Sequence, residues 1–238
     1  MVGMLGAALP VAAYDPIGYA SRDYQYANDL LNSFQNRFQY DLVDPVRKRV
    51  YREQRAGATS ATTQRSAAPA VVPTTFRPTG AAGGGVDKLV SAYPASMHGQ
   101  VRTEFRKLLD GFRQIEKQFG LPPNDVASAV AAFLAGSYMG YRNANFPDEH
   151  FKPLVAQMRE ALATDARFAQ AGHAERQDMF EQLATLGMLM ATTQIGLQRQ
   201  PDAGIEARMR QTGKAYLEAF LKTGAERVRL TAAGLRVD

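Results

Sequence analysis

Cysteine is absent from this chain of 238 residues. A disulfide framework, a thiolate metal site and a cysteine nucleophile are therefore excluded. Histidine is scarce too, since His98, His150 and His173 lie on separate segments and form no His-x-x-x-His pair. The cluster "PDEH" at 147–150 is better explained by acidic residues at a helix start than by metal binding. The sequence predicts no metal centre and no cofactor.

A strong charge of one sign is also lacking. The net charge is +5, from 28 Lys and Arg against 23 Asp and Glu. Neutralising phosphates usually takes a denser cationic surface, so nucleic acid is not an expected partner. The apolar fraction of 45% is ordinary for a globular chain with a real core.

No uncharged run is long enough to span a membrane. The run from Val126 to Gly140 is apolar or small at nearly every position and lies between Asp125 and Arg142. It is too short, because a spanning helix needs about 20 apolar residues. We therefore expect a buried central helix at about 125–142 and no transmembrane helix. The residues expected at the centre of the core are Val126, Val130, Phe133 and Leu134.

Apolar residues at steps of three and four predict further helices on both sides of this run. The expected ranges are about 101–119, 150–162, 173–199 and 203–223, with Asn124 as a cap of the central helix. Pro147 or Asp148 can begin the second of these helices. Pro153 is tolerated if the regular helix begins only near residue 150, and otherwise it produces a kink. The last residues, 227–238, alternate briefly and fit an extended tail or a turn of helix. The predicted fold class is all-α, a bundle of about five helices.

Small residues and three prolines fill the segment 56–85, which ends in "GAAGGG" at 80–85. Such a composition buries too little apolar surface to order itself. We therefore predict a disordered linker over 56–85 and a bundle domain over 86–238. The glycines lack the Lys-Ser/Thr of a phosphate-binding loop and are interpreted as a flexible hinge.

The segment 1–13, "MVGMLGAALPVAA", is apolar and rich in small side chains. Ala13 and Val11 suit the positions before a signal peptidase cut, which predicts cleavage before Tyr14. The basic region that normally begins a signal peptide is missing, so a truncated signal peptide or an apolar tail both fit. The expected location is the bacterial periplasm or exterior.

Residues 14–55 form an arm that carries eight of the 22 Phe and Tyr residues. Helical spacing within 22–41 predicts an amphipathic helix, and a short basic helix follows Asp44-Pro45. Two such helices cannot close a core alone, so their apolar face needs a partner. The predicted partner-binding residues are Leu30, Leu31, Phe34, Phe38 and Tyr40. The basic residues, which predict peripheral contact with an anionic membrane surface or a solvated face, are Arg47, Lys48, Arg49, Arg52 and Arg55.

Four stretches together resemble a known family: "FGLPPNDVASAVAAFLAGSYMGYRN", "LVAQMREAL", "QLATLGMLMATTQ" and the terminal "VRLTAAGL". They are similar to a family of exported bacterial helical proteins catalogued only as a domain of unknown function. The similarity covers about 86–236 and leaves the aromatic arm outside. It implies an exported helical domain and no functional residues.

Three hypotheses about function remain open from the sequence. The first is a non-catalytic interaction or assembly protein of the bacterial envelope or exterior, docking a partner or another subunit through the arm. The second is a hydrolase of an envelope polymer that uses paired carboxylates. The third is an arm packed on its own bundle with a structural role. The carboxylates that could supply a pair are Glu104, Glu116, Asp125, Glu160, Glu175 and Glu181.

Overall fold

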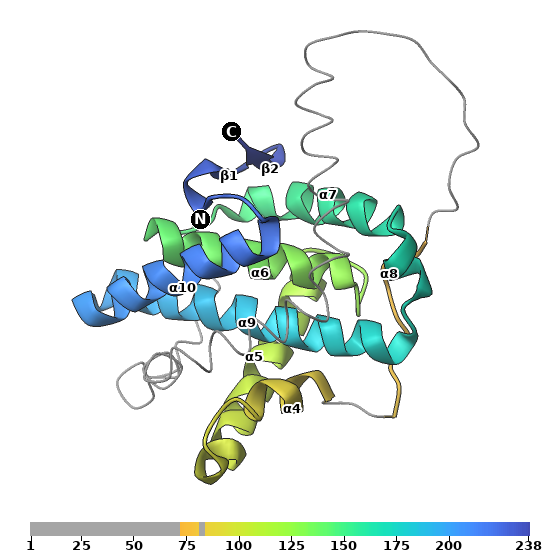
Figure 1. Ribbon diagram of the computed structural model, residues 1–238, viewed down its shortest axis with the longest axis horizontal. Helices are drawn as coiled ribbons and strands as arrows, with labels where there is room; N and C mark the ends of the chain where they lie inside the picture. The colour runs from red at the N-terminus through yellow and green to blue at the C-terminus, as the bar shows by residue number, and fades with distance from the viewer. Residues whose placement is uncertain (1–71, 81–83) are drawn as a thin grey trace, which may run out of the picture.

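The computed structural model describes residues 72–80 and 84–238 (Figure 1). These residues form seven α-helices, three short 3-10 helices and one β-hairpin, which confirms the predicted all-α bundle. The α-helices are α4 Gly84–Val90, α5 His98–Gln118, α6 Val126–Arg142, α7 Phe151–Ala163, α8 Ala166–Gln170, α9 His173–Arg199 and α10 Ala203–Leu221. The short elements are η1 Ala95–Met97, η2 Asp148–His150, η3 Ala225–Arg227, β1 Val228–Thr231 and β2 Gly234–Val237.

Helix α6 is the centre of the bundle, as the apolar run predicted. Fourteen of its 17 residues are buried, and it packs most extensively on α9, then on α10 and α7. Figure 1 shows α6 lying between α7 and α9. The side chains expected at the centre, Val126, Val130, Phe133 and Leu134, are all buried. No helix within the described residues is long and apolar enough to cross a membrane.

Glycines let the helix backbones around α6 approach closely. A Cβ added at Gly136 would stand 2.3 Å from the carbonyl oxygen of Gly187 on α9. At Gly213 on α10 it would stand 2.4 Å from the carbonyl oxygen of Ser137. The two glycines of Gly136-x-x-x-Gly140 thus have different neighbours. Gly136 lies against the backbone of α9, and Gly140 makes room for Met190 of α9 and Met209 of α10. Larger side chains would force the three helices apart.

Two helix starts depend on single residues. The N-cap of α6 is Asp125, whose carboxylate accepts from the N–H of Ala127 at 3.0 Å. The prediction that Asn124 caps this helix is wrong, because Asn124 has a left-handed backbone (φ 58) and its carbonyl binds another segment. Helix α7 begins at Phe151, so Pro153 lies in the first turn, where no intrahelical N–H bond is lost.

The end of the predicted linker is ordered against the bundle, contrary to expectation. Residues 72–80, which we name the strap, bury the side chains of Thr74 and Phe76, and the ring of Phe76 packs edge-on against Phe180 at 5.4 Å. Gly84 and Gly85 begin α4 instead of forming a hinge, and Gly85 is buried. The composition of the segment could not predict this order, because Thr74 and Phe76 are single residues whose partners lie far along the chain.

The chain ends in a two-stranded antiparallel sheet, so the last residues are extended. Leu230 is paired with Leu235 in its register. The side chain of Gln157 on α7 donates to the carbonyl of Leu235 at 3.0 Å and accepts from its N–H at 2.7 Å. Gln157 therefore supplies the hydrogen bonds that a third strand would make along the outer edge of β2, which fixes the hairpin to the bundle.

Candidate functional site

The residues predicted to bind a partner or an anionic surface all belong to the N-terminal arm. They lie outside the residues that the structure describes. The partner-binding set is Leu30, Leu31, Phe34, Phe38 and Tyr40, and the basic set is Arg47, Lys48, Arg49, Arg52 and Arg55.

The carboxylates named for a hydrolase are mostly dispersed. Glu104 pairs with Lys107 in an exposed i,i+3 ion pair, and Glu160 lies on an exposed face of α7. Glu175 accepts from the N–H of Gly172 at the start of α9. Buried Glu181 accepts from the N–H of Gly85 at 3.0 Å, so it fixes α4 to α9.

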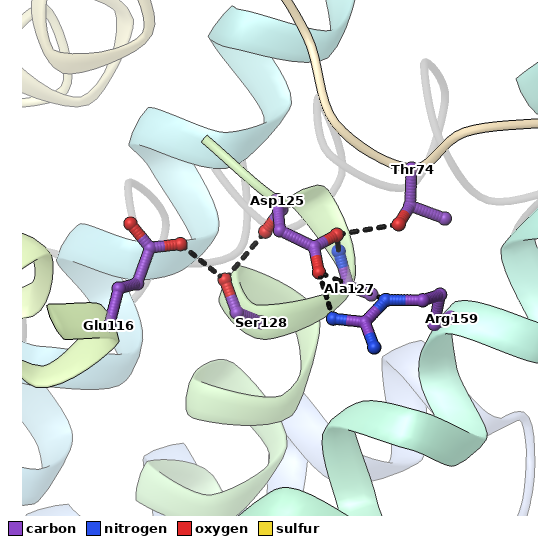
Figure 2. Close-up of polar contacts among 6 residues, drawn as sticks. All are labelled: Thr74, Glu116, Asp125, Ala127, Ser128 and Arg159. Atoms are coloured by element: carbon purple, nitrogen blue, oxygen red, sulfur yellow. Dashed lines mark hydrogen bonds and ion pairs between the residues drawn. The ribbon is translucent and has the colours of Figure 1, made fainter. Parts of the chain in front are cut away.

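Glu116 and Asp125 are brought together with Thr74, Ser128 and Arg159, and we name these five residues the α6 polar cluster (Figure 2). The members come from four places: the strap, the end of α5, the start of α6 and the middle of α7. Segments far apart in the chain thus meet at the first turn of the central helix.

Asp125 is fully buried and accepts hydrogen bonds from three directions. The hydroxyl of Thr74 donates to Oδ1 at 2.6 Å, beside the N–H of Ala127. Arg159 donates from Nη2 to Oδ2 at 2.6 Å, and from Nε at 3.2 Å. A buried charge needs such partners to offset the loss of water. Asp125 therefore joins the strap, the start of α6 and α7 at one point.

Glu116 organises the turn between α5 and α6. The hydroxyl of Ser128 lies 2.7 Å from Oε1 of Glu116 and 2.6 Å from the carbonyl oxygen of Asp125. Burial raises the pKa of the Glu116 carboxyl, although the hydrogen bonds from Ser128 and from the backbone of Asp125 and Asn124 favour the charged form. The hydrogen bonds of Glu116 therefore stabilise the turn, while its burial disfavours the charged form of the carboxyl.

This geometry does not suit hydrolysis of a polymer. A glycosidase needs one carboxyl group that protonates the leaving group and another that reaches the sugar or a water. Asp125 is 0% exposed and Glu116 is 2% exposed, and both are bound by groups of their own chain. Within the part of the chain that the structure describes, no three His, Asp or Glu side chains gather so that they could hold a metal ion. The cluster acts as a structural joint.

Three members of the cluster were missed from the sequence. Ser128 had a usable signal, because it is a polar residue one turn into an apolar helix and three positions after the N-cap. Thr74 had none, since it lies among many threonines and alanines. Arg159 had none either, because one arginine on an amphipathic helix is normally solvated.

We expect the Glu116→Gln variant to gain stability relative to the wild type as the pH rises. The folded-state pKa of Glu116 is raised, so the folded chain holds more protons than the unfolded chain between the two pKa values. The free energy of unfolding therefore falls as the pH rises through that window. Glutamine is neutral and still accepts from Ser128. Urea unfolding at several pH values measures the difference, and an advantage that grows toward acid pH would contradict this reading.

The model of a family of unknown function, DUF6683, matches residues 3–238, so the chain belongs to this family. Comparison with curated proteins and with solved structures gave no match. The match confirms the resemblance to a family of unknown function and extends it beyond residues 86–236, because it includes the aromatic arm as well as the bundle.

Proposed function

We propose, for this member of the DUF6683 family, a non-catalytic role in interaction or assembly at the bacterial envelope or exterior. In this proposal the arm, residues 14–55, docks on a partner protein or on another subunit. The observation that carries it is the arm's composition, which concentrates eight of 22 aromatic rings in a segment too small to form a core. Large apolar anchors of this kind dominate the energy of protein interfaces.

The burial and hydrogen bonding of the carboxylates in the bundle support the same proposal. The two carboxylates that come together, Glu116 and Asp125, are bound by their own chain. They hold helices in place and are closed to a substrate. The described residues thus favour a scaffold, and the arm is the part of the sequence best suited to recognition.

The attachment of the strap gives such a scaffold a fixed point. The N–H of Val72 donates to the carbonyl oxygen of Ala163 at the end of α7, at 3.3 Å. The guanidinium of Arg176 donates to the carbonyl oxygen of the following residue, Pro73, at 2.9 Å. The chain therefore joins the bundle at a defined place beside α7 and α9.

Location is part of the proposal and depends on the segment 1–13. Its small, apolar side chains and the cleavage pattern before Tyr14 support export. The basic residues of the arm, from Arg47 to Arg55, suit a second contact with an anionic membrane surface.

Deletion of residues 14–55 tests the proposal. We expect the full chain to form a larger species by light scattering, and the deleted chain to run as a single bundle with unchanged cooperative melting. A matched variant keeps the length and replaces Leu30, Leu31, Phe34 and Phe38 by serine. Replacement of the five basic residues by glutamine is the control for charge. If deletion leaves the mass unchanged, the arm is not the docking element.

A further inference from the structure

Two guanidinium groups converge where the β-hairpin meets the central helix. Arg142, the last residue of α6, donates from Nη2 to the carbonyl oxygens of Glu226 at 3.3 Å and Val228 at 3.2 Å. Arg229 of β1 donates from Nη1 to the same two oxygens, at 2.5 and 3.1 Å. Because both side chains bind the same pair of oxygens, their positive charges are held side by side.

Arg236 of β2 adds a third guanidinium group. It is the cross-strand partner of Arg229 in the hairpin, and both side chains are exposed on the face opposite the buried Val228 and Leu235. Directly opposed side chains have Cβ atoms about 5 Å apart, and like charges in such a pair destabilise a sheet. Within the described part of the chain, Arg236 makes no ion pair and no side-chain hydrogen bond. An anion held between the two arginines would offset their repulsion.

Acidic side chains do little to neutralise these three groups. Oδ2 of Asp238 lies 3.4 Å from Nε of Arg229, in an ion pair whose acid is 62% exposed. The carboxylate of Glu226 is turned toward Gly224 instead. Among the residues that the structure describes, the three arginines therefore share one side-chain carboxylate, at long range and open to solvent.

Aromatic rings hold Arg142 in place without removing its charge. Its guanidinium lies over the ring of Tyr141, 5.0 Å from the centroid, and over that of Tyr138 at 5.5 Å. A cation–π contact orients the group and leaves its N–H donors available. Both hydrogen bonds of Arg142 come from Nη2, so its Nη1 has no partner among the described residues. The junction thus presents a fixed cation beside two exposed ones.

We propose that Arg142, Arg229 and Arg236, which we name the arginine triad, bind a phosphate group. A carboxylate is satisfied by the paired N–H groups of a single arginine. A phosphate monoester carries about two negative charges and three acceptor oxygens, so it suits several guanidinium groups that approach from different elements. The triad uses no residue of the arm, and this inference therefore goes beyond the proposed function.

The variant Arg236→Gln tests the proposal with little risk to the fold, because Arg236 is exposed and has no partner to lose. Calorimetric titration of the full-length chain with inorganic phosphate at low salt should show binding weakened about tenfold. The Tm in phosphate-free buffer should stay the same or rise, since a like-charge pair is removed. Arg106→Gln is the matched control, because Arg106 is also exposed and unpaired, on α5 at the far side of the bundle (Figure 1). It should bind phosphate as the wild type does.

Two further comparisons make the titration specific to the triad. All chains carry glutamine in place of the five basic residues of the arm, so that the arm cannot contribute to phosphate binding. Asp238→Asn should tighten binding about two- to fivefold, because it removes the acid that competes for Arg229. Acetate should bind more weakly than phosphate at equal ionic strength.

Sedimentation with vesicles identifies the source of the phosphate group. Binding to mixed phosphatidylglycerol and phosphatidylcholine vesicles, but not to phosphatidylcholine alone, and its loss in Arg236→Gln would assign the triad to an anionic lipid headgroup. Phosphate binding without vesicle binding would assign it to a soluble phosphate ester. The proposal is overturned if Arg236→Gln and Arg142→Lys bind phosphate and vesicles as the wild type does, or if phosphate binds no better than acetate.

Discussion

Replacing Asp125 by alanine should lower the free energy of unfolding by about 3 kcal/mol, since it removes an N-cap and leaves a buried hydroxyl without its acceptor. The cap to Ala127 contributes about 1 kcal/mol of this. The hydroxyl of Thr74, held at 2.6 Å and buried, accounts for most of the rest. Arg159 adds little, because its side chain is 39% exposed and can turn to water.

The matched control for this change is Asp202→Ala at the start of α10. Asp202 also accepts from a backbone N–H, that of Ile205 at 2.8 Å, but it is exposed. We expect a cost of about 1 kcal/mol there. Thermal melting should separate the two variants, with the larger change lowering the Tm by about 6 to 12 °C. Equal effects would mean that Asp125 is only a helix cap and does not join three segments.

Replacing Gly187 by alanine should cost about 3 kcal/mol, at the upper end of the range for overpacking. The added Cβ would stand 2.5 Å from the carbonyl carbon of Ala132 and 2.6 Å from its oxygen. These are backbone atoms of α6, so no side chain can rotate to relieve the contact. Helices α6 and α9 would have to separate along their whole interface, which is the most extensive one in the bundle.

Gly99→Ala on α5 is the control for the helical preference of alanine. Nothing lies within 4 Å of a Cβ added at Gly99, and the position is exposed. Alanine there should stabilise the chain by up to about 1 kcal/mol. Urea unfolding of both variants measures the contrast, and a neutral Gly187→Ala would refute the close backbone contact.

Hydrophobic patterning predicted five of the seven described α-helices, because each of the five covers a face of one core, and it missed the short helices α4 and α8. The long uncharged run identified α6, and of the two alternatives left open at Pro153, a helix start near residue 150 or a kink, the structure has the first. The same patterning could not show how close α6 comes to α9, because Gly136 and Gly187 face each other only after the chain has folded.

The strap and the polar cluster could not be predicted from composition. Thr74 and Phe76 look like other residues of a Thr/Ala-rich segment, and their partners Asp125 and Phe180 lie at least 51 residues away. The burial of Asp125 and Glu116 was also hidden, since acids near helix ends are normally solvated. Both the strap and the polar cluster therefore depend on tertiary contacts that form only in the folded chain.

Hydrogen exchange along α6 is the most direct test of the central claim, that neighbouring helices close water off from this helix on all sides. We predict that its amide protons exchange only when the whole bundle unfolds, with a protection free energy equal to the free energy of unfolding from urea. The short helix α8 should exchange faster and serves as the internal reference. Exchange of α6 through openings several kcal/mol smaller than global unfolding would contradict the account.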